Sequence, residues 1–427
     1  MTLIKVENLS EYRFLKKDSL EKDTQLQKSV SEILLTVQKN GDKSLYDYSK
    51  KFDKVDIPAI LVPIDRLREA EKKISSSVRK IFEGAIDNIK VFHNQQTQKS
   101  WQLHYEDGTK LGEKVTPLDR VGIYVPGGKA FYPSTMIMNT IPAVLAGVPS
   151  IIIASPPCEN GLPHELVLAI CSMLNIREVI AVGGAQAIAA LAFGTESIRA
   201  VCKITGPGNR FVAEAKRQVF GKVGIDSIAG PSEIVILHDD PSIPDEYLAR
   251  DLLTQAEHDE DATAILITNQ EHSARNVQKL INDLVPTLPR KEIITKSLIA
   301  NGKIILVEKI EDGIEFVNTF APEHLELMVQ NLTIVEKIKN AGAIFIGRWS
   351  SETIGDYYAG PNHTIPTSGA ARYGSPLSVR DFQKHSSIIE YSKSRLMSEL
   401  NQISEFAKLE GLFAHAEAVL TRRSEES

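Results

Sequence analysis

The chain has 427 residues, of which 42% are apolar and 24% are charged, and its formal net charge is −6. This length exceeds one typical domain, so we expect two or more domains with sizeable apolar cores in a soluble globular protein. The acidic balance, with no dense Lys/Arg tract that interleaves aromatic residues, argues against nucleic acid as the main partner.

The sequence shows no targeting or membrane signal. Its start, MTLIKVENLSEYRFLKKDSLEKD, is charged throughout and has no apolar stretch of the kind found in a secretory signal. The longest apolar run, IPAVLAGVPSIIIASPP, is interrupted by prolines, so it lacks the roughly 20 continuous apolar residues of a membrane span. The three cysteines match no zinc or redox motif and indicate a reducing compartment. We therefore expect a cytoplasmic protein without membrane contact.

The first part of the chain, from about Ser19 to Phe92, is predicted to be mostly helical. LQKSVSEILLTVQKNG (residues 26–41) has apolar residues at helical spacing and ends at Gly41. A second amphipathic run, RLREAEKKISSSVRKIFEGAIDNIKVFH, spans residues 66–93.

From Arg120 the pattern changes to strands that alternate with helices. The predicted strands lie in VGIYVPGG, SIIIASPP, EVIAVGG, ITGPGN, SEIVILHDD, ATAILIT, GKIILVE and GAIFIG. Such alternation, with nearly continuous apolar strands, predicts α/β units with mainly parallel sheets covered on both faces. After about Ser378 we expect no further strands, and residues 387–423 are predicted to form two helices broken near Gly411.

Three glycine-containing turns follow predicted strands, at residues 125–128 (VPGG), 182–184 (VGG) and 206–209 (GPGN). In an open α/β sheet such turns lie past the carboxyl ends of strands, where helix N-termini bind phosphate well. None matches G-x-G-x-x-G, so a tight connection and a nucleotide site are both open. Three nearby residues have two possible roles: Tyr124, Gln186 and Asn209. Gln186 and Asn209 either form helix caps or turn hydrogen bonds or contact a cofactor, and Tyr124 either packs in the core or contacts a cofactor.

Acidic residues and histidines recur in three further segments. In QAEHD, Gln255 and His258 are three apart near the end of a predicted helix, where they share one face and can both reach a metal. The alternative is a surface histidine favoured by the helix dipole. Asp356 and His363 lie in the loop-rich ETIGDYYAGPNHTIPTSG, where a ligand role competes with local turn hydrogen bonds. His415, in the last predicted helix, is either solvated or completes a site if the tail docks on another subunit.

The segment APEHLEL (residues 321–327) places two titratable groups side by side among apolar residues. Pro322 is expected to start a helix at Glu323. Adjacent helical residues point about 100° apart, so Glu323 and His324 suit two separate proton-transfer roles rather than an ion pair. The alternative places both on a helix surface. If Glu323 is buried, desolvation raises its pKa toward the range of a general base.

Taken together, these segments resemble the histidinol dehydrogenase family. The resemblance runs from roughly Gln25 to Arg422 and is carried by GGAQAIAALAFGTE, GPGN with FVAEAKRQV, AGPSE, QAEHD, APEHLEL and GDYYAGPNHTIPT in this order. It implies a homodimer in the cytoplasm that oxidises L-histidinol to L-histidine through the aldehyde, the last step of histidine biosynthesis. Two NAD⁺ are used per histidinol. It also implies one zinc ion per active site and sites shared between subunits.

The resemblance also assigns residues by their place in the matching motifs. The zinc ligands would be Gln255, His258, Asp356 and His415. The acid–base residues would be Glu323 and His324. The substrate contacts would be Ser232, Gln255, His258, His324, Asp356, His363, Glu410 and His415. The NAD⁺ contacts would be Tyr124, Gln186 and Asn209, of which Tyr124 fits the motif spacing least well.

The fold implied is α/β, with two incomplete Rossmann-like parallel-sheet domains and small helical domains at both ends. The expected division is residues 1–23 as an N-terminal helical extension, 24–123 with 234–377 as the zinc and catalytic domain, 124–233 as the NAD⁺ domain, and 378–427 as a helical tail that reaches the partner's site. Two other readings are a zinc-dependent hydrolase of a small amide or ester and a catalytically silent phospholigand-binding α/β protein.

Overall fold

A computed structural model of the chain describes residues 2–5, 23–127, 132–228 and 230–426. The chain divides into two units, one formed by Met1–Gln96 and Leu118–Phe382 and the other by Thr97–Pro117 and Gln383–Ser427. The first unit contains a five-stranded and a six-stranded parallel sheet, and the second contains a three-stranded antiparallel sheet with two helices. The predicted α/β class with two parallel sheets is confirmed.

The five-stranded sheet has the order β6-β5-β4-β7-β8. Its strands are β4 (Val121–Tyr124), β5 (Ile151–Ala154), β6 (Glu178–Ile180), β7 (Lys203–Thr205) and β8 (Gly224–Ile225). Its helices are α1 (Thr24–Tyr48), α2 (Ile64–Lys73), α3 (Ser76–Asn94), α4 (Pro133–Leu145), α5 (Glu165–Met173), α6 (Gly184–Phe193) and α7 (Arg210–Val219). All residues of β4 and β5 are buried, as their apolar sequences predict.

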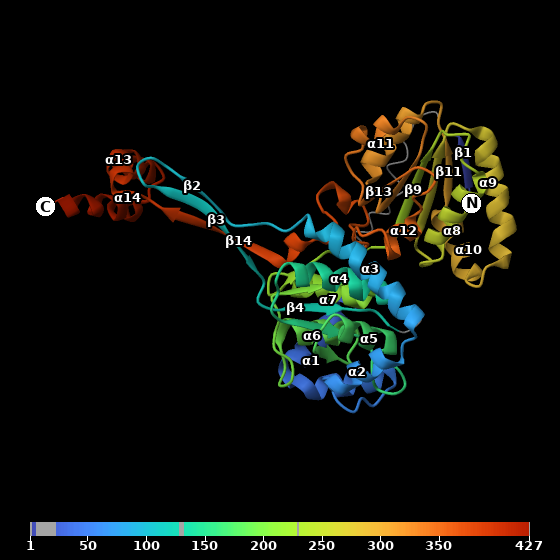
Figure 1. Cartoon of the computed structure of the whole chain (residues 1–427), viewed down its shortest axis with the longest axis horizontal. Helices are drawn as coiled ribbons and strands as arrows, with labels where there is room; N and C mark the ends of the chain where they lie inside the picture. Colours follow the sequence, from blue (N-terminus) through green and yellow to red (C-terminus); the bar gives the residue numbers. More distant parts are fainter. Residues whose placement is uncertain (1, 6–22, 128–131, 229, 427) are drawn as a thin grey trace. The chain divides into compact units, whose positions relative to one another are not determined.

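The N-terminal helices belong to this sheet. α1 packs against α6 and α7, α2 packs against α5 (Figure 1), and Val30 and Leu45 share one apolar core with Ile123 and Ile152. This differs from the expectation that residues 24–123 accompany the zinc domain. Gly41 has a φ of 54° inside α1, so the predicted helix end is a kink after which the helix continues.

The six-stranded sheet has the order β1-β11-β10-β9-β12-β13. Its strands are β1 (Thr2–Lys5), β9 (Glu233–His238), β10 (Thr263–Thr268), β11 (Lys303–Leu306), β12 (His324–Met328) and β13 (Ala343–Ile346). Its helices are α8 (Asp245–Ala256), α9 (Glu271–Leu284), α10 (Lys291–Asn301), α11 (Ile310–Phe320) and α12 (Glu352–Tyr357). Short helical turns elsewhere are η2 (Ser49–Asp53), η3 (Val285–Thr287), η4 (Leu332–Lys337), η5 (Ala370–Arg372), η6 (Val379–Phe382) and η7 (Thr421–Glu426).

This sheet separates two apolar cores. Ile234 and Ile236 of β9 pack in a core with α8, α9 and α10, whereas Val235 and Leu237 pack in a core with α11 on the opposite face. Figure 1 shows α11 on one side of the strands and α9 and α10 on the other. Successive residues of a strand point to opposite faces, so an unbroken apolar strand is what a sheet covered on both sides requires.

Three expectations about secondary structure are wrong. Thr2–Lys5, expected in an N-terminal helical extension, form β1, which pairs with β11, and residues 6–22 lie outside the described part. His324–Met328, expected in a helix, form β12. This segment is a strand because it pairs in parallel with β9 on one side and β13 on the other. Gln383–Glu390, which overlap the predicted tail helices, form β14. The remaining limits of the domain division stay a prediction.

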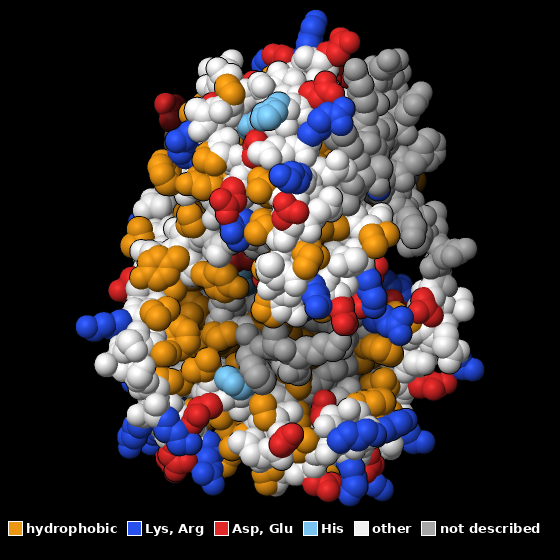
Figure 2. All heavy atoms as spheres, turned by 90° about the vertical axis from the view of Figure 1, so that its right-hand side faces the viewer, with side chains coloured by type: hydrophobic (Ala, Val, Ile, Leu, Met, Phe, Trp, Pro, Cys, Tyr) orange, Lys and Arg blue, Asp and Glu red, His pale blue; other side chains and the backbone are white. Residues whose placement is uncertain are grey.

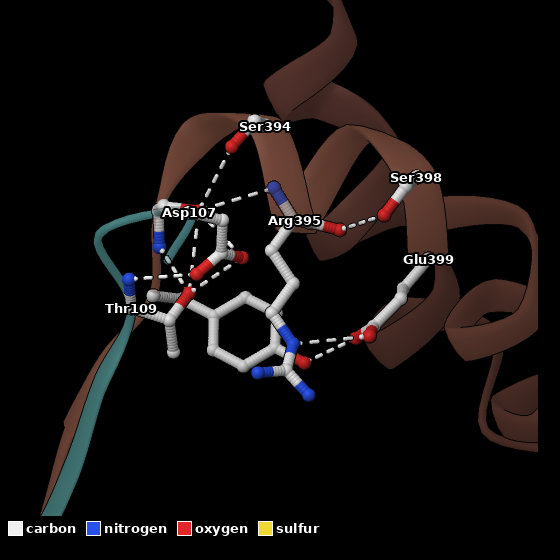
Figure 3. Close-up of polar contacts among 8 residues, drawn as sticks. Asp107, Thr109, Ser394, Arg395, Ser398 and Glu399 are labelled. Carbon is white, nitrogen blue, oxygen red and sulfur yellow. Dashed lines mark hydrogen bonds and ion pairs between the residues drawn. The ribbon is translucent and has the colours of Figure 1, made fainter. Parts of the chain in front are cut away.

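The second unit is a hairpin that carries the C-terminal helices. β14 and β2 (Trp101–His104) pair antiparallel with β3 (Lys110–Pro117), followed by α13 (Lys393–Leu409) and α14 (Phe413–Leu420). The two helices broken near Gly411 are thus confirmed. Figure 3 shows the turn residues Asp107 and Thr109 beside the start of α13. Ser392 caps α13 and donates to Asp107 Oδ2 at 3.2 Å, and the Arg395 guanidinium lies 4.6 Å from the Tyr105 ring centre.

The surface charges and the helices of the described residues agree with what the sequence predicted about nucleic-acid and membrane partners. On the face shown in Figure 2, basic and acidic side chains are interspersed, and its coloured atoms form no field of one sign. In the part of the chain that the structure describes, no helix has the length and apolarity needed to cross a bilayer.

Candidate active site

The predicted catalytic pair, Glu323 and His324, lies at the amino end of β12, beside the amino end of the neighbouring strand β9. Glu323 precedes β12 directly, and Ser232 precedes β9, which pairs in parallel with β12. The usual ligand edge of an open α/β sheet is the opposite, carboxyl edge. Here α8 ends beside these amino ends, so Gln255 and His258 at its end reach the same place.

Glu323 is a buried carboxyl group, 6% exposed. Its Oε2 accepts a hydrogen bond from the backbone N–H of Glu233 at 2.9 Å, and the Ser232 hydroxyl also bonds to it. Burial raises the pKa of Glu323 well above its ordinary value, and the nearby charges of Glu233 and Asp356 raise the pKa further. The sequence predicted this direction, and its physical consequence is a stronger base than an exposed glutamate.

His324 is 4% exposed, and burial lowers its pKa to about 3, with His258 and His363 adding to the shift. Its Nδ1 lies 3.2 Å from the carbonyl oxygen of Glu233 and 3.1 Å from Gln255 Oε1. A carbonyl oxygen only accepts, so Nδ1 carries the hydrogen and Nε2 is left as the basic nitrogen. At neutral pH, His324 is therefore a neutral imidazole.

Three side chains beside this pair could hold a metal ion. One nitrogen or oxygen atom from each of His258, Glu352 and Asp356 lies within 4.8 Å of the other two. Imidazole nitrogen and carboxylate oxygen are both ligands of Zn²⁺, so this set fits the expected ion. Gln255 contacts the same cluster through His324. Of the predicted ligands, His258 and Asp356 thus lie in this cluster and Gln255 lies next to it, and their binding of zinc stays a prediction.

Glu352 was not among the residues predicted from the motifs. It is fully buried, and its Oε1 lies 3.6 Å from His324 Nδ1. Burial raises its pKa well above the ordinary value, as do the charges of nearby acids. The signal for it was present in ETIGD, because Glu352 and Asp356 are four apart and share one face of α12.

A second pair of acids, the buried Glu326 and the half-buried Asp251, lies next to the start of α12. Glu326 Oε1 accepts the backbone N–H of Glu352 at 2.9 Å. Burial raises the pKa of Glu326 strongly and that of Asp251 to about 6, and the two carboxyl groups hydrogen-bond to each other. Two buried carboxyl groups in contact hold a shared proton, since both cannot ionise at low cost. This pair fixes the start of α12 and hence the position of Glu352.

His363, a predicted substrate contact, lies beside Asp356. Its Nδ1 is 3.0 Å from the Asp356 carbonyl oxygen, and its Nε2 is 3.4 Å from Thr135 Oγ1 of α4. Burial lowers the pKa of His363 to about 4. Asn362 Nδ2 donates to the carbonyl oxygen of Met138, also in α4. The loop after α12 is therefore bonded to both α12 and α4.

Glu410 and His415 belong to the second unit, whose placement relative to the first is not described. Glu410 is the C-cap of α13, and His415 is exposed on α14. Large apolar side chains around them are also exposed, with Phe406 at 66%, Leu409 at 84% and Phe413 at 65%. Whether these two residues complete a site stays a prediction.

The three residues predicted to contact NAD⁺ lie at or past the carboxyl ends of strands in the five-stranded sheet. Tyr124 is 3% exposed, and its hydroxyl accepts a hydrogen bond from the N–H of Gly184 at 3.1 Å. Burial raises its pKa to about 12. Gln186 is 2% exposed in the first turn of α6. Asn209 is exposed, and its Oδ1 caps α7 by accepting from two backbone N–H groups. Tyr124 is thus a core residue and Asn209 a helix cap, which are the local roles that the sequence left open. Contact of the three residues with NAD⁺ stays a prediction.

The GPGN turn rests on a buried ion pair. Asp226 Oδ2 accepts the N–H of Gly206 at 2.8 Å, and Lys216 Nζ donates to the carbonyl oxygen of the same glycine at 3.0 Å. Lys216 and Asp226 also pair with each other, and their side chains are 3% and 4% exposed. Gly206 has a φ of 108°, and a Cβ there would lie 2.0 Å from the Tyr124 carbonyl oxygen. Only glycine fits this turn, which is held on both sides.

Known proteins match nearly the whole length of the chain. The model of the family described as histidinol dehydrogenase matches residues 16–423. Histidinol dehydrogenase of Bacillus subtilis is 49% identical over 408 residues, covering 95% of each chain, and that of Halalkalibacterium halodurans is 48% identical over 425 residues, covering 99% of this chain and 100% of its own. A crystal structure of histidinol dehydrogenase from Elizabethkingia anophelis superposes with a TM-score of 0.94 at 36% identity, covering 100% of this chain and 99% of that one. The chain therefore belongs to the histidinol dehydrogenase family and is an oxidoreductase.

Proposed function

We propose that the protein oxidises L-histidinol to L-histidine in two steps through L-histidinaldehyde, consuming two NAD⁺, as the last step of histidine biosynthesis. The observation that carries this proposal is the meeting of two different bases, Glu323 and neutral His324, with a metal-type cluster. An alcohol oxidation followed by an aldehyde hydration needs two proton acceptors at different positions, and this arrangement supplies them.

In this proposal a zinc ion is held by Gln255, His258, Asp356 and His415 of the partner subunit. The support is the short separation of His258 and Asp356 donor atoms and the contact of Gln255 with the same cluster. When bound, zinc serves as a template that orients the substrate's imidazole and amine nitrogens. Glu352, whose carboxylate belongs to the same cluster, then lies against His324 and helps to fix its ring.

The proposed proton transfers are assigned to His324 and Glu323 by their positions. His324 Nε2 accepts the proton of the substrate hydroxyl as hydride leaves the same carbon, and His324 then releases this proton to solvent. Glu323 next accepts a proton from the water that adds to the aldehyde, because its raised pKa makes it a competent base. His324, neutral again, accepts the hydroxyl proton of the hydrate in the second oxidation. NAD⁺ supplies the hydride acceptor in each oxidation.

The substrate would be held by residues of two protomers. The proposed contacts are Ser232, Gln255, His258, His324, Asp356 and His363 from one protomer, with Glu410 and His415 from the tail of its partner. NAD⁺ would contact Tyr124, Gln186 and Asn209. The exposed apolar residues around Glu410 and His415 support a homodimer, because a neighbouring protomer would cover them. We also place the enzyme in the cytoplasm.

The decisive experiment counts reduced cofactor per substrate. Purified protein with limiting L-histidinol and excess NAD⁺ should form two NADH and one histidine, lose this activity to a strong chelator and regain it with Zn²⁺. One NADH per histidinol would contradict the two-step reaction. Activity that survives complete metal removal would contradict the zinc proposal. Metal-dependent hydrolysis of small amides or esters without any NADH would favour a hydrolase instead.

A further inference from the structure

The segment that leads into β9 bonds to both proposed bases. The backbone N–H of Glu233 donates to Glu323 Oε2 at 2.9 Å, and the carbonyl oxygen of the same residue lies 3.2 Å from His324 Nδ1. The Ser232 hydroxyl adds a second hydrogen bond to Glu323. Because one short segment contacts both side chains, a shift of this segment would displace Glu323 and His324 together.

Thr367 holds the start of this segment from a distant part of the chain. Its Oγ1 accepts the backbone N–H of Gly230 at 2.6 Å. Thr367 is 6% exposed, and a buried N–H that loses its acceptor is costly, so this bond favours one position of the segment. Further along, the N–H of Thr263 in β10 donates to the carbonyl oxygen of Ser232 at 2.9 Å. The segment is therefore held at two points.

The backbone around Thr367 has an unusual shape that permits this contact. Ser368 has a φ of 54°, a left-handed conformation that residues other than glycine seldom adopt. A Cβ at Gly230 would lie 2.1 Å from Ser368 Oγ and 3.3 Å from Thr367 Oγ1, so glycine is required for the close approach of the two segments. Backbone strain of this kind persists where the surrounding structure enforces it, and it concentrates at functional sites.

The loop that carries Thr367 also lies beside the amino end of β12. A Cβ at Gly342 would lie 2.6 Å from the carbonyl oxygen of Glu323 and 3.3 Å from that of Pro366, the residue before Thr367. The loop therefore contacts the segment before β9 and approaches the backbone of Glu323. Both neighbours belong to the amino edge of the six-stranded sheet, where the two proposed bases lie.

We propose that Thr367 is a positioning residue for the oxidation, which holds the segment Gly230–Glu233 where that segment orients Glu323 and His324. The proposal rests on the roles proposed above for these two bases. A base that is misplaced by about 1 Å can slow its reaction on the order of 10²-fold in an enzyme that is otherwise folded. Both oxidations use His324 and the second also uses Glu323, so loss of the Thr367 hydroxyl slows both.

The test measures the first-turnover rate of NADH formation by the zinc-loaded enzyme at saturating substrate and NAD⁺, with L-histidinol and with L-histidinaldehyde. Thr367→Val keeps the branched shape and removes the acceptor, so both rates should fall about 10–100-fold while zinc content is unchanged. Thr367→Ser keeps the hydroxyl, so both rates should stay within about threefold of wild type.

Thr268→Val is the matched control for the loss of a buried threonine hydroxyl. Thr268 is fully buried, and its Oγ1 accepts the backbone N–H of Gln270 at 3.0 Å, at the opposite, carboxyl edge of the same sheet. This variant should lower the melting temperature, as Thr367→Val does, but its first-turnover rates should stay within about twofold of wild type.

A second pair of variants reaches the same contact from the other side and decides the matter if Thr367→Val does not fold. Gly230→Ala should push the segment away from Ser368 and slow both steps. Addition of Ser368→Gly removes the side chain that the new methyl group meets, and glycine suits a φ of 54°. The double variant should therefore return both rates to within about fivefold of wild type.

The proposal is overturned if Thr367→Val folds and keeps either rate within about twofold of wild type, or if Thr268→Val loses as much rate as Thr367→Val. It is also overturned if Gly230→Ala has normal rates or if Ser368→Gly fails to restore them. These failures leave NADH formation by the unmodified enzyme intact, whereas failure of the proposed function removes that activity altogether, so the two are distinguishable.

Discussion

Replacement of Lys216 by methionine tests whether the buried ion pair beneath the GPGN turn holds that turn in place. The change leaves the Asp226 carboxylate, 4% exposed, without its cation and the Gly206 carbonyl oxygen without its donor. Removal of one partner of a buried pair typically costs about 3–5 kcal/mol, because the remaining charge is buried and uncompensated. We therefore expect Lys216→Met to lower the free energy of unfolding by this amount.

The double variant Lys216→Met with Asp226→Asn separates charge from shape. Asparagine is neutral, and its Oδ1 can still accept the N–H of Gly206, so the penalty for an unpaired charge disappears. We expect the double variant to recover at least about half of the lost stability. It still lacks the donor to the Gly206 carbonyl oxygen, so the turn is less well fixed, and NADH should bind about tenfold more weakly than to wild type.

Urea denaturation gives the stability differences, and NADH fluorescence titration gives the affinities. Lys296→Met is the matched control, because its pair with Glu260 is 62% and 53% exposed and should contribute no more than about 1 kcal/mol. A loss below about 1 kcal/mol in Lys216→Met would refute the reasoning about burial. A double variant as unstable as the single one would show that charge is not the cause. If the double variant recovered full stability and bound NADH as tightly as wild type, the Lys216–Asp226 pair would have no role in positioning the GPGN turn.

Two other predictions follow from the site. Glu323→Gln should keep its zinc, measured by elemental analysis, while the rate of histidinaldehyde oxidation falls roughly 10²–10⁴-fold, and a normal rate would remove Glu323 as the base that activates water. His258→Asn should lose most of its zinc and raise the KM for histidinol at least about tenfold, so full zinc retention would exclude His258 from the ligand set.

The sequence by itself determined the α/β class and most parallel strands, because strands covered on both faces must be nearly continuously apolar, as in β4 and β5. The ordered motifs also led to the prediction of Glu323 and His324 as acid–base residues and of Gln255, His258 and Asp356 as ligands of one metal ion. These features depend on local pattern and on motif order, both of which can be read along the chain.

Only the tertiary structure decided features that depend on a distant partner. β12 is a strand because β9 and β13 flank it, and nothing local to APEHLEL requires that. The residues that form β14 and β1 likewise become strands by pairing with β3 and β11. Glu352 joins the cluster because Glu326 fixes the start of α12. Long-range pairing and burial set these positions, so no window of neighbouring residues could reveal them.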